Sequence, residues 1–275
     1  MKRNKLYLIF GCAILLVFVI FAAAPGLIAP YGIKEMFTAF EKPCAEHILG
    51  TNDLGYDIFT EIVYAARASL MIGVASAAIS LVIGTVMGLL AGYLPSWKGE
   101  IFSGIIQIFI LIPMLPMAIV IAAFAGNTTA NIIIIIAVLG WCATARTVRT
   151  RTLQLKQTAF CESLMILGLS RKRIMTRHIL PNLTEVVLSR YIMSVSRCMM
   201  LEATLSFLGM GDITEVTWGR MINLAYRGGA FMKGLYGWLV APGVCIALII
   251  IAFYCINRYF ELRAQEVSGA QSYLD

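Results

Sequence analysis

The residues best suited to bind a partner lie in a polar, basic segment, residues 160–182. The first half of this segment is amphipathic and stops at Gly168. Its apolar stripe consists of Phe160, Leu164 and Leu167. A short helix with such a stripe can sit in a groove on a partner protein. Gly168 permits a sharp turn into a second helix, and Pro181 ends that helix.

The second half of the same segment is strongly basic. Its cations are Arg171, Lys172, Arg173 and Arg177. Taken alone, these residues fit a helix that lies on the membrane surface and contacts anionic lipid as well as they fit a docking helix. Residue types and spacing therefore leave both interpretations open.

A second polar group lies within an otherwise apolar segment, residues 183–208. Its members Arg190, Ser194, Arg197 and Thr204 fall within a wedge of about 80° on a helix that turns ~100° per residue. Ionisable groups within a span usually face a bundle interior or a water-filled path. This stripe, together with Glu202, suits an anionic or carboxylate-bearing solute. The alternative is structural: Arg190 reaches the interface, and Arg197 pairs with Glu202 or a partner subunit.

The sequence carries no nucleotide-binding or catalytic pattern. Gly-x-x-x-x-Gly-Lys-Ser/Thr is absent, so ATP hydrolysis would have to come from another chain. The two histidines, His47 and His178, are far apart in the sequence and make no nucleophile–base pair. His47 and Cys44 lack a third ligand at metal-binding spacing, so we interpret them as surface residues. We predict a chain that is not an enzyme and holds no metal or cofactor.

Composition places these residues in a membrane protein. Of 275 residues, 60% are hydrophobic and 13% are charged, which is more apolar surface than one globular core can hide. The apolar runs are continuous rather than short and alternating, which favours helices over a β-barrel. The predicted fold is an all-α membrane protein with a single transmembrane domain, residues 6–257. A short N-terminus (1–5) and a polar tail (258–275) flank it.

Six apolar segments predict six transmembrane helices, at about 6–24, 69–93, 101–124, 130–145, 183–208 and 235–256. The first run, 19 residues long, is sufficient to cross ~30 Å of hydrocarbon. We interpret it as an uncleaved span, with a cleaved signal peptide as the alternative. The segment of about 146–182 forms a loop between the fourth and fifth spans.

Glycines and prolines mark two special spans. Gly84 and Gly88 form a Gly-x-x-x-Gly pair, which permits close helix approach and, in a chain with several spans, favours internal packing over dimerisation. Pro113 and Pro116 lie inside the third span and remove backbone donors. They predict a bent or broken helix there.

The basic residues also predict the orientation of the chain. With six spans both termini share one side, and that side holds fourteen Lys and Arg, including those of the 146–182 loop. The opposite side holds six. By the positive-inside rule, both termini and this loop are cytoplasmic. The net charge of +7 is therefore explained by topology, and nucleic-acid binding is not needed to account for it.

The 160–182 segment resembles the cytoplasmic loop of a known family, the inner-membrane permease subunits of ABC importers, in particular the dipeptide/oligopeptide/nickel group. The family pattern is Glu-Ala-Ala, three residues, Gly, nine residues and then an apolar-x-Leu-Pro ending. The matching residues here are Glu162, Ser163, Leu164, Gly168, Leu180 and Pro181. Ser163 and Leu164 depart from Ala-Ala, and His178 takes an apolar position of the pattern.

Three further segments resemble the same family and appear in its order. They are residues 49–59, 202–211 and 218–222. The resemblance extends from about residue 48 to the last span. It implies the fold of a type I ABC importer permease, located in the cytoplasmic (inner) membrane.

The resemblance also implies partners and residue roles. The loop helix would be a coupling helix docked on an ATP-hydrolysing subunit, with Glu162 and Gly168 transmitting its motion. Expected partners are a second permease subunit, two ATP-binding subunits that hold ATP and Mg²⁺, and an extracytoplasmic solute-binding protein. The face for the binding protein would include Asp53, Asp57, Trp218 and Arg220.

The resemblance leaves the solute open. It implies uptake of di- or oligopeptides, with nickel or another metal-chelate as the alternative. A more remote alternative is an ATP-independent secondary transporter, for which one expects an inverted repeat and ion-coupling carboxylates in the spans. We find no such repeat in the sequence.

Overall fold

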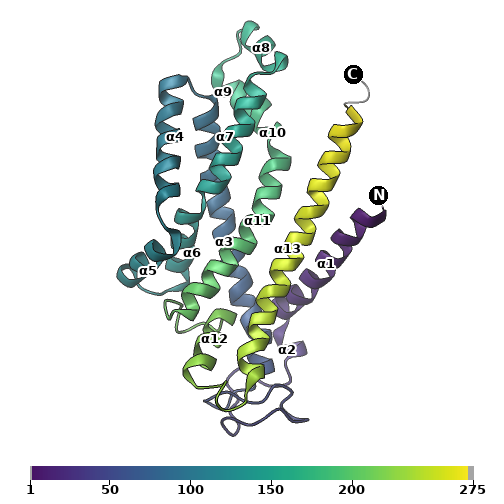
Figure 1. Cartoon of the computed structure of the whole chain (residues 1–275), viewed down its shortest axis with the longest axis vertical. Coiled ribbons are helices and arrows are strands. Elements are labelled where there is room, and N and C mark those ends of the chain that lie inside the picture. Colours follow the sequence, from purple (N-terminus) through teal and green to yellow (C-terminus); the bar gives the residue numbers. More distant parts are fainter. Residues whose placement is uncertain (1, 272–275) are drawn as a thin grey trace.

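The computed structural model describes residues 2–271 and folds over this range into helices joined by turns and one long loop, residues 29–57 (Figure 1). This confirms the expected all-α class. The helices are α1 (Lys2–Ala23), α2 (Pro25–Ile28), α3 (Ile58–Tyr93), α4 (Ser96–Leu111), α5 (Met114–Ala125), α6 (Thr129–Gly140), α7 (Cys142–Lys156), α8 (Ala159–Ile166), α9 (Arg171–Ile174), the π-helix η1 (Met175–Ile179), α10 (Leu180–Asn182), α11 (Thr184–Phe207), α12 (Trp218–Arg227) and α13 (Tyr236–Gln271).

Within the part of the chain that the structure describes, four helices are long and apolar enough to cross a membrane, namely Lys5–Ala23, Ile58–Tyr93, Thr129–Lys156 and Tyr236–Arg263. The pair α4 and α5 adds a fifth if it is one bent span. The remaining expected span, α11, has 24 residues and is long enough at ~1.5 Å per residue. It is not counted among the apolar helices because it carries four charged residues. They are Glu185, Arg190, Arg197 and Glu202.

Two helices extend beyond the spans expected from the sequence. The helix that contains the second span begins at Ile58, where the carboxylate of Asp57 caps α3 by accepting a hydrogen bond from the Thr60 N–H. The helix that was expected to end near residue 145 continues as α7 to Lys156. The loop between the fourth and fifth spans is therefore helical at its start.

The prolines of the third span break its helix as predicted. α4 ends at Leu111, α5 begins at Met114, and the two axes are bent by 85°. Pro113 occupies the N-cap position of α5, where its missing N–H costs no helical hydrogen bond.

The glycine pair of the second span packs internally, as expected. A methyl group on Gly84 would lie 2.6 Å from the Trp141 carbonyl oxygen, and one on Gly88 would lie 2.4 Å from that of Ala145. Gly92 continues the row against Thr152. Only glycine lets α3 approach Trp141 and α7 this closely.

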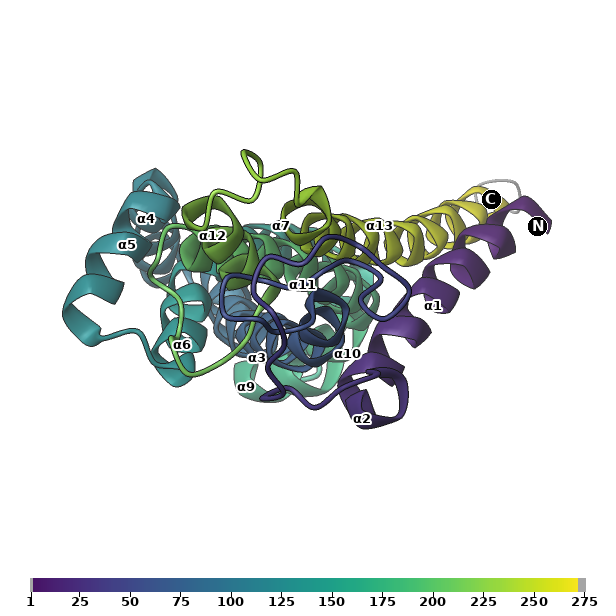
Figure 2. The ribbon, with the colours of Figure 1, turned by 90° about the horizontal axis from the view of Figure 1, so that it is seen from below.

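The two ends of the molecule differ in character. Both termini of the described chain and α8 lie toward one end, which we call the α8 end (Figure 1). The loop of residues 29–57 and α12 cover the other end, which we call the loop end, over α3 and α11 (Figure 2). α1 belongs to this fold, because Phe18 is buried and its ring packs edge-on against Trp218, with 5.3 Å between centroids.

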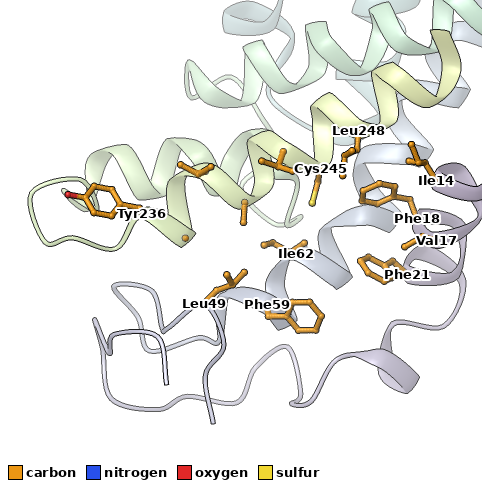
Figure 3. A pocket seen from close by; sticks show the side chains of 14 residues that line it. Ile14, Val17, Phe18, Phe21, Leu49, Phe59, Ile62, Tyr236, Cys245 and Leu248 are labelled. Atoms are coloured by element: carbon orange, nitrogen blue, oxygen red, sulfur yellow. The ribbon is translucent and has the colours of Figure 1, made fainter. Parts of the chain in front are cut away.

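An apolar cavity of about 700 Å³ lies between α1, α13 and the start of α3 (Figure 3). Its walls include Phe18 and Phe21 of α1, Ile62 of α3, and Val240 and Leu248 of α13. The lining contains no charged side chain. This cavity therefore offers nothing to bind a charged solute, and the candidate site lies elsewhere.

Candidate functional site

α8 presents an apolar tip at the α8 end. The side chains of Phe160, Ile166 and Leu167 are 53%, 87% and 74% exposed. Leu164 is half-buried and packs with Cys161 against the inner cluster that contains Tyr93 and Val148. The apolar stripe that was expected on one face of α8 is therefore divided. Leu164 packs inward and anchors the helix, whereas Phe160 and Leu167 are exposed, as is Ile166. Exposed apolar side chains of this size on a short helix mark a site of protein contact.

The turn after α8 depends on Gly168. Its φ is +75°, in the left-handed region that L-residues with a side chain avoid. The N–H of Gly168 donates to the Met165 carbonyl at 3.0 Å, and that of Leu169 donates to the Leu164 carbonyl at 3.3 Å. These bonds close the helix end in the manner of a glycine C-cap. Nothing lies within 4 Å of where a methyl group on Gly168 would sit, so conformation rather than space selects glycine.

A return helix, made of α9, η1 and α10, runs from Arg171 to Asn182 and leads into α11. Its π-helical part, Met175–Ile179, ends two residues before Pro181, which has no N–H to donate and clashes with a regular α-helical turn. Sequence reasoning missed this π-helix, although Pro181 was its visible signal. Ile174 and Ile179 bury the inner side of the return helix.

The residues expected to couple to the ATPase gather in these two short helices. Glu162, Ser163 and Pro181 are exposed, and Leu180 is 38% exposed. The Ser163 hydroxyl donates to the Ala159 carbonyl at 2.8 Å within α8. α8 and the return helix also touch through Phe160 and His178, whose ring centroids are 5.9 Å apart.

The polar stripe of the fifth span lies on the outer face of α11. Arg197 is exposed, and Arg190, Ser194 and Thr204 are half-buried. The Thr204 hydroxyl donates to the Met200 carbonyl at 2.7 Å. Exposed methionines, Met193 and Met200, flank the stripe and were not singled out from the sequence. Flexible thioethers beside polar groups make an adaptable surface.

Glu202 does not belong to this stripe, which corrects its expected place in a solute path. Its side chain is 1% exposed and accepts a hydrogen bond from the Ser206 hydroxyl at 2.7 Å. No ion pair joins Arg197 to Glu202 within residues 2–271. The inner face of α11 is fixed by close contacts: a methyl group on Gly219 would lie 2.6 Å from the Ala203 Cα. Glu202 is therefore a structural residue between α11 and the start of α12.

Two residues expected to contact a binding protein are buried instead. Trp218 is 1% exposed; its indole N–H donates to the Ile62 carbonyl at 3.0 Å, and its backbone N–H donates to the Ser69 hydroxyl at 3.1 Å. Asp57 is 3% exposed and caps α3. Both hold the loop end together rather than forming its surface. Asp53 and Arg220 are half-buried and keep the expected role as a prediction.

His47 is also buried, which corrects its interpretation as a surface residue. It is 2% exposed, its Nδ1 lies 3.0 Å from Oδ1 of Asp57, and its Nε2 lies 3.6 Å from Oε2 of Glu41. The rings of Tyr31 and Phe37 pack beside it, at 5.1 and 4.5 Å between centroids. His47 thus ties the long loop to the first turn of α3.

A second link at the loop end joins α6 to the turn after α11. Asp212 accepts hydrogen bonds from the N–H and the hydroxyl of Thr129, both at 2.8 Å. It also accepts from the N–H and the hydroxyl of Thr214, at 2.9 and 2.6 Å. Partial burial alone would raise the pKa of Asp212, but these four donors outweigh it and lower the pKa to about 2.

Comparison with known proteins identifies the family of this chain. Residues 84–266 match the family model described as binding-protein-dependent transport system inner membrane component. The dipeptide transport system permease protein DppC of Alkalihalophilus pseudofirmus is 31% identical over 94% of this chain and 84% of its own.

The glutathione transport system permease protein GsiD of Escherichia coli is 35% identical over 82% of this chain and 75% of its own. The oligopeptide transport system permease protein OppC of Bacillus subtilis is 32% identical over 81% of this chain and 73% of its own. The family model covers α8, the return helix and α4 to most of α13. The chain therefore belongs to the family of binding-protein-dependent transport system inner membrane components.

Proposed function

We propose that this chain is the pore-forming permease subunit of an ATP-driven importer that takes up short peptides. The observation that carries the proposal is the exposed apolar tip of α8, held by the Gly168 turn at the end of a helical bundle. In a family whose members work with other subunits, this tip is suited to bind a separate ATP-hydrolysing protein. The chain itself is a non-catalytic subunit.

The family assignment and the α8 tip support a particular assembly. We place α8 and both termini in the cytoplasm, as the Lys and Arg bias suggests. Two ATP-binding subunits, which hold ATP and Mg²⁺, dock there. A second permease subunit packs beside this one in the membrane, and an extracytoplasmic solute-binding protein delivers the peptide to the loop end. ATP-driven movement of α8 rocks the spans and opens the path to alternate sides.

The peptide substrate is supported by chemistry and by relatives. The relatives named above are called dipeptide, oligopeptide and glutathione permeases, and all of these solutes carry a carboxylate. Arg197 on the exposed face of α11 offers a charge-assisted contact for such a group. Nickel or a metal-chelate remains the second candidate, suggested only by the motif resemblance. The family assignment leaves no support for an ATP-independent secondary transporter.

Uptake by cells tests the proposal directly. A strain that lacks this chain is supplied with a radiolabelled dipeptide and, separately, with radiolabelled nickel, and uptake is compared before and after the chain is restored. The proposal predicts that restoring the chain restores energy-dependent dipeptide uptake and leaves nickel uptake unchanged. Restored nickel uptake without dipeptide uptake would contradict the substrate assignment. Dipeptide uptake that persists when the partner ATPases are deleted would contradict the proposed coupling.

A further inference from the structure

The outer side of the return helix carries a concentrated positive charge. Its four cations, Arg171, Lys172, Arg173 and Arg177, are all exposed. None of the three ion pairs found within residues 2–271 involves them. A depression of about 400 Å³ opens on this side. It is lined by Ser170, Lys172, Arg173, Thr176 and Arg177. Cations gathered around a depression without a carboxylate in its lining form a binding site for an anion.

The inner side of the same helix fixes where this site lies relative to the spans. Ile174 and Ile179 are 0% and 1% exposed and pack with Leu89 and Tyr93 in one buried cluster. Tyr93 is the last residue of α3, a helix that meets the criteria for a membrane span. The return helix therefore lies at the level of the end of α3, and its cations lie at the same level.

A neighbouring pair of residues marks the same boundary. Trp97, in the first turn of α4 just after α3 ends, is 62% exposed, and the ammonium group of Lys98 lies 5.1 Å from the centre of its ring. Exposed Trp and Lys at the end of a span are typical of the headgroup region of a bilayer. The anion nearest to the cationic depression is then a lipid phosphate.

The cationic depression also differs in chemistry from the docking surface. The tip of α8 is apolar, with Ile166 at 87% exposure, and suits a protein groove. The depression is lined by charged and hydroxyl side chains and suits a phosphodiester. The Ser170 side chain makes no capping hydrogen bond to α9, so its hydroxyl is available to a ligand. Arg173 and Arg177 add planar guanidinium groups, which match phosphate oxygens in pairs.

We propose that this depression binds the phosphodiester headgroup of an anionic lipid from the cytoplasmic leaflet. The proposal rests on the orientation given under the proposed function. The bound lipid holds the return helix at the bilayer surface, while α8 stays free to engage the ATPase. Basic clusters just cytoplasmic to a span bind anionic lipids in this way.

The test uses the permease purified with its partner subunits and placed in nanodiscs of phosphatidylcholine, alone or mixed with phosphatidylglycerol. Phosphatidylglycerol that stays bound after transfer to detergent is counted by native mass spectrometry. The variant Arg173→Gln/Arg177→Gln removes two cations of the depression. The control Lys34→Gln/Lys42→Gln removes two exposed cations from the long loop at the other end. Each cation lost from the site should weaken lipid binding about fivefold, so Arg173→Gln/Arg177→Gln should bind phosphatidylglycerol about 25-fold more weakly than the wild type. The control should bind it as the wild type does.

Three results would overturn the proposal. In the first, retention of phosphatidylglycerol is equal in both variants. In the second, inorganic phosphate displaces the lipid completely, which makes the depression a site for soluble anions. In the third, Arg173→Gln/Arg177→Gln loses its ATPase subunits in pure phosphatidylcholine, which assigns the cations to an acidic protein surface. Lipid retention without any peptide uptake by the wild type would contradict the proposed function alone.

Discussion

Asp212 and Thr129 are 83 residues apart in the sequence, yet one carboxylate oxygen of Asp212 accepts both the backbone N–H and the hydroxyl of Thr129 at 2.8 Å. This pair joins the first turn of α6 to the turn that follows α11. At the loop end it therefore links α6, which follows the broken span α4–α5, to α11. Because donors surround the carboxylate, its pKa falls to about 2.

The low pKa of Asp212 predicts a pH-dependent contribution to stability. The pKa in the folded state lies below the ordinary value of 3.8, so the stabilisation is fully present above about pH 4 and is lost as the pH falls toward 2. Because the carboxylate is only partly buried and solvent screens its charge, we expect a contribution of about 1 kcal/mol. Asp212→Asn should lower the unfolding temperature at pH 7, and the difference from wild type should shrink between pH 4 and pH 2.

The control for Asp212 is Glu215→Gln, which neutralises an exposed carboxylate three residues away. This control should unfold as the wild type does at each pH. A difference between Asp212→Asn and wild type that stays constant down to pH 2 would rule out the proposed role of the charge.

The row of glycines on α3 predicts a large effect of added volume. In Gly88→Val the new side chain would meet the Ala145 carbonyl at 2.4 Å and Val148 at 2.8 Å, so α3 and α7 must separate. Overpacking of this kind costs ~1–3 kcal/mol. We expect less folded protein on size-exclusion chromatography in detergent.

A matched helix glycine lies on α4. Gly104 has nothing within 4 Å of where its methyl group would sit, so Gly104→Ala should be neutral or gain up to ~1 kcal/mol from helix propensity. Equal behaviour of Gly88→Val and Gly104→Ala would show that the α3–α7 contact is not tight.

Arg197 is the residue of α11 whose charge we expect to act on the solute. Arg197→Ala removes a charge-assisted contact of ~1.5–3 kcal/mol, so peptide uptake should need about 10- to 150-fold more substrate for half-maximal rate. Arg197→Lys keeps the charge and should recover part of this loss. Assembly, followed by co-purification of the partner subunits, should be normal in both. Unchanged uptake in Arg197→Ala would remove this residue from the path.

The sequence alone predicts those features of this structure whose physical cause lies in neighbouring residues. Pro113 has no N–H to donate and its ring opposes a regular helical turn before it, so a bend or break there is a local effect. The spacing of Gly84 and Gly88 is likewise a property of one helix face. Both features were therefore readable in advance. The π-helix before Pro181 was not, because a proline permits a kink, a cap or a π-turn and packing of the return helix selects among them.

The burial of polar and aromatic loop residues could not be predicted from the sequence. Trp218 bonds to Ser69, 149 residues earlier, and His47 meets Asp57 across a loop. Such partners follow from the tertiary fold and not from neighbouring residues. The inward direction of Glu202 has the same origin, since the close approach of Gly219 to Ala203 belongs to the tertiary packing of α11 against α12. The coupling segment was predictable because its chemistry is carried by consecutive residues.

Gly168 provides a test of the turn that presents the docking tip. Its φ of +75° makes Gly168→Val cost ~1–2 kcal/mol of local strain, released by unwinding the end of α8. We expect peptide uptake to be lost while the protein stays in the membrane. Gly229→Val is the control, because Gly229 has a φ of +68° and similar open space at the other end. If uptake falls equally in both variants, strain alone explains the effect and the turn has no special role.

The central claim is that the apolar tip of α8 docks on a separate ATPase. Its most direct test is co-purification of the ATP-hydrolysing subunits with a tagged Ile166→Asp/Leu167→Asp variant. The control is Ile213→Asp, which changes an apolar side chain of comparable exposure, 75%, in the turn before α12. Burial of each tip residue contributes ~1.5–3 kcal/mol, so the double variant should bind the ATPase at least about 150-fold more weakly, and the control should bind it normally. Retention of the ATPase subunits by the double variant at the wild-type level would contradict the claim.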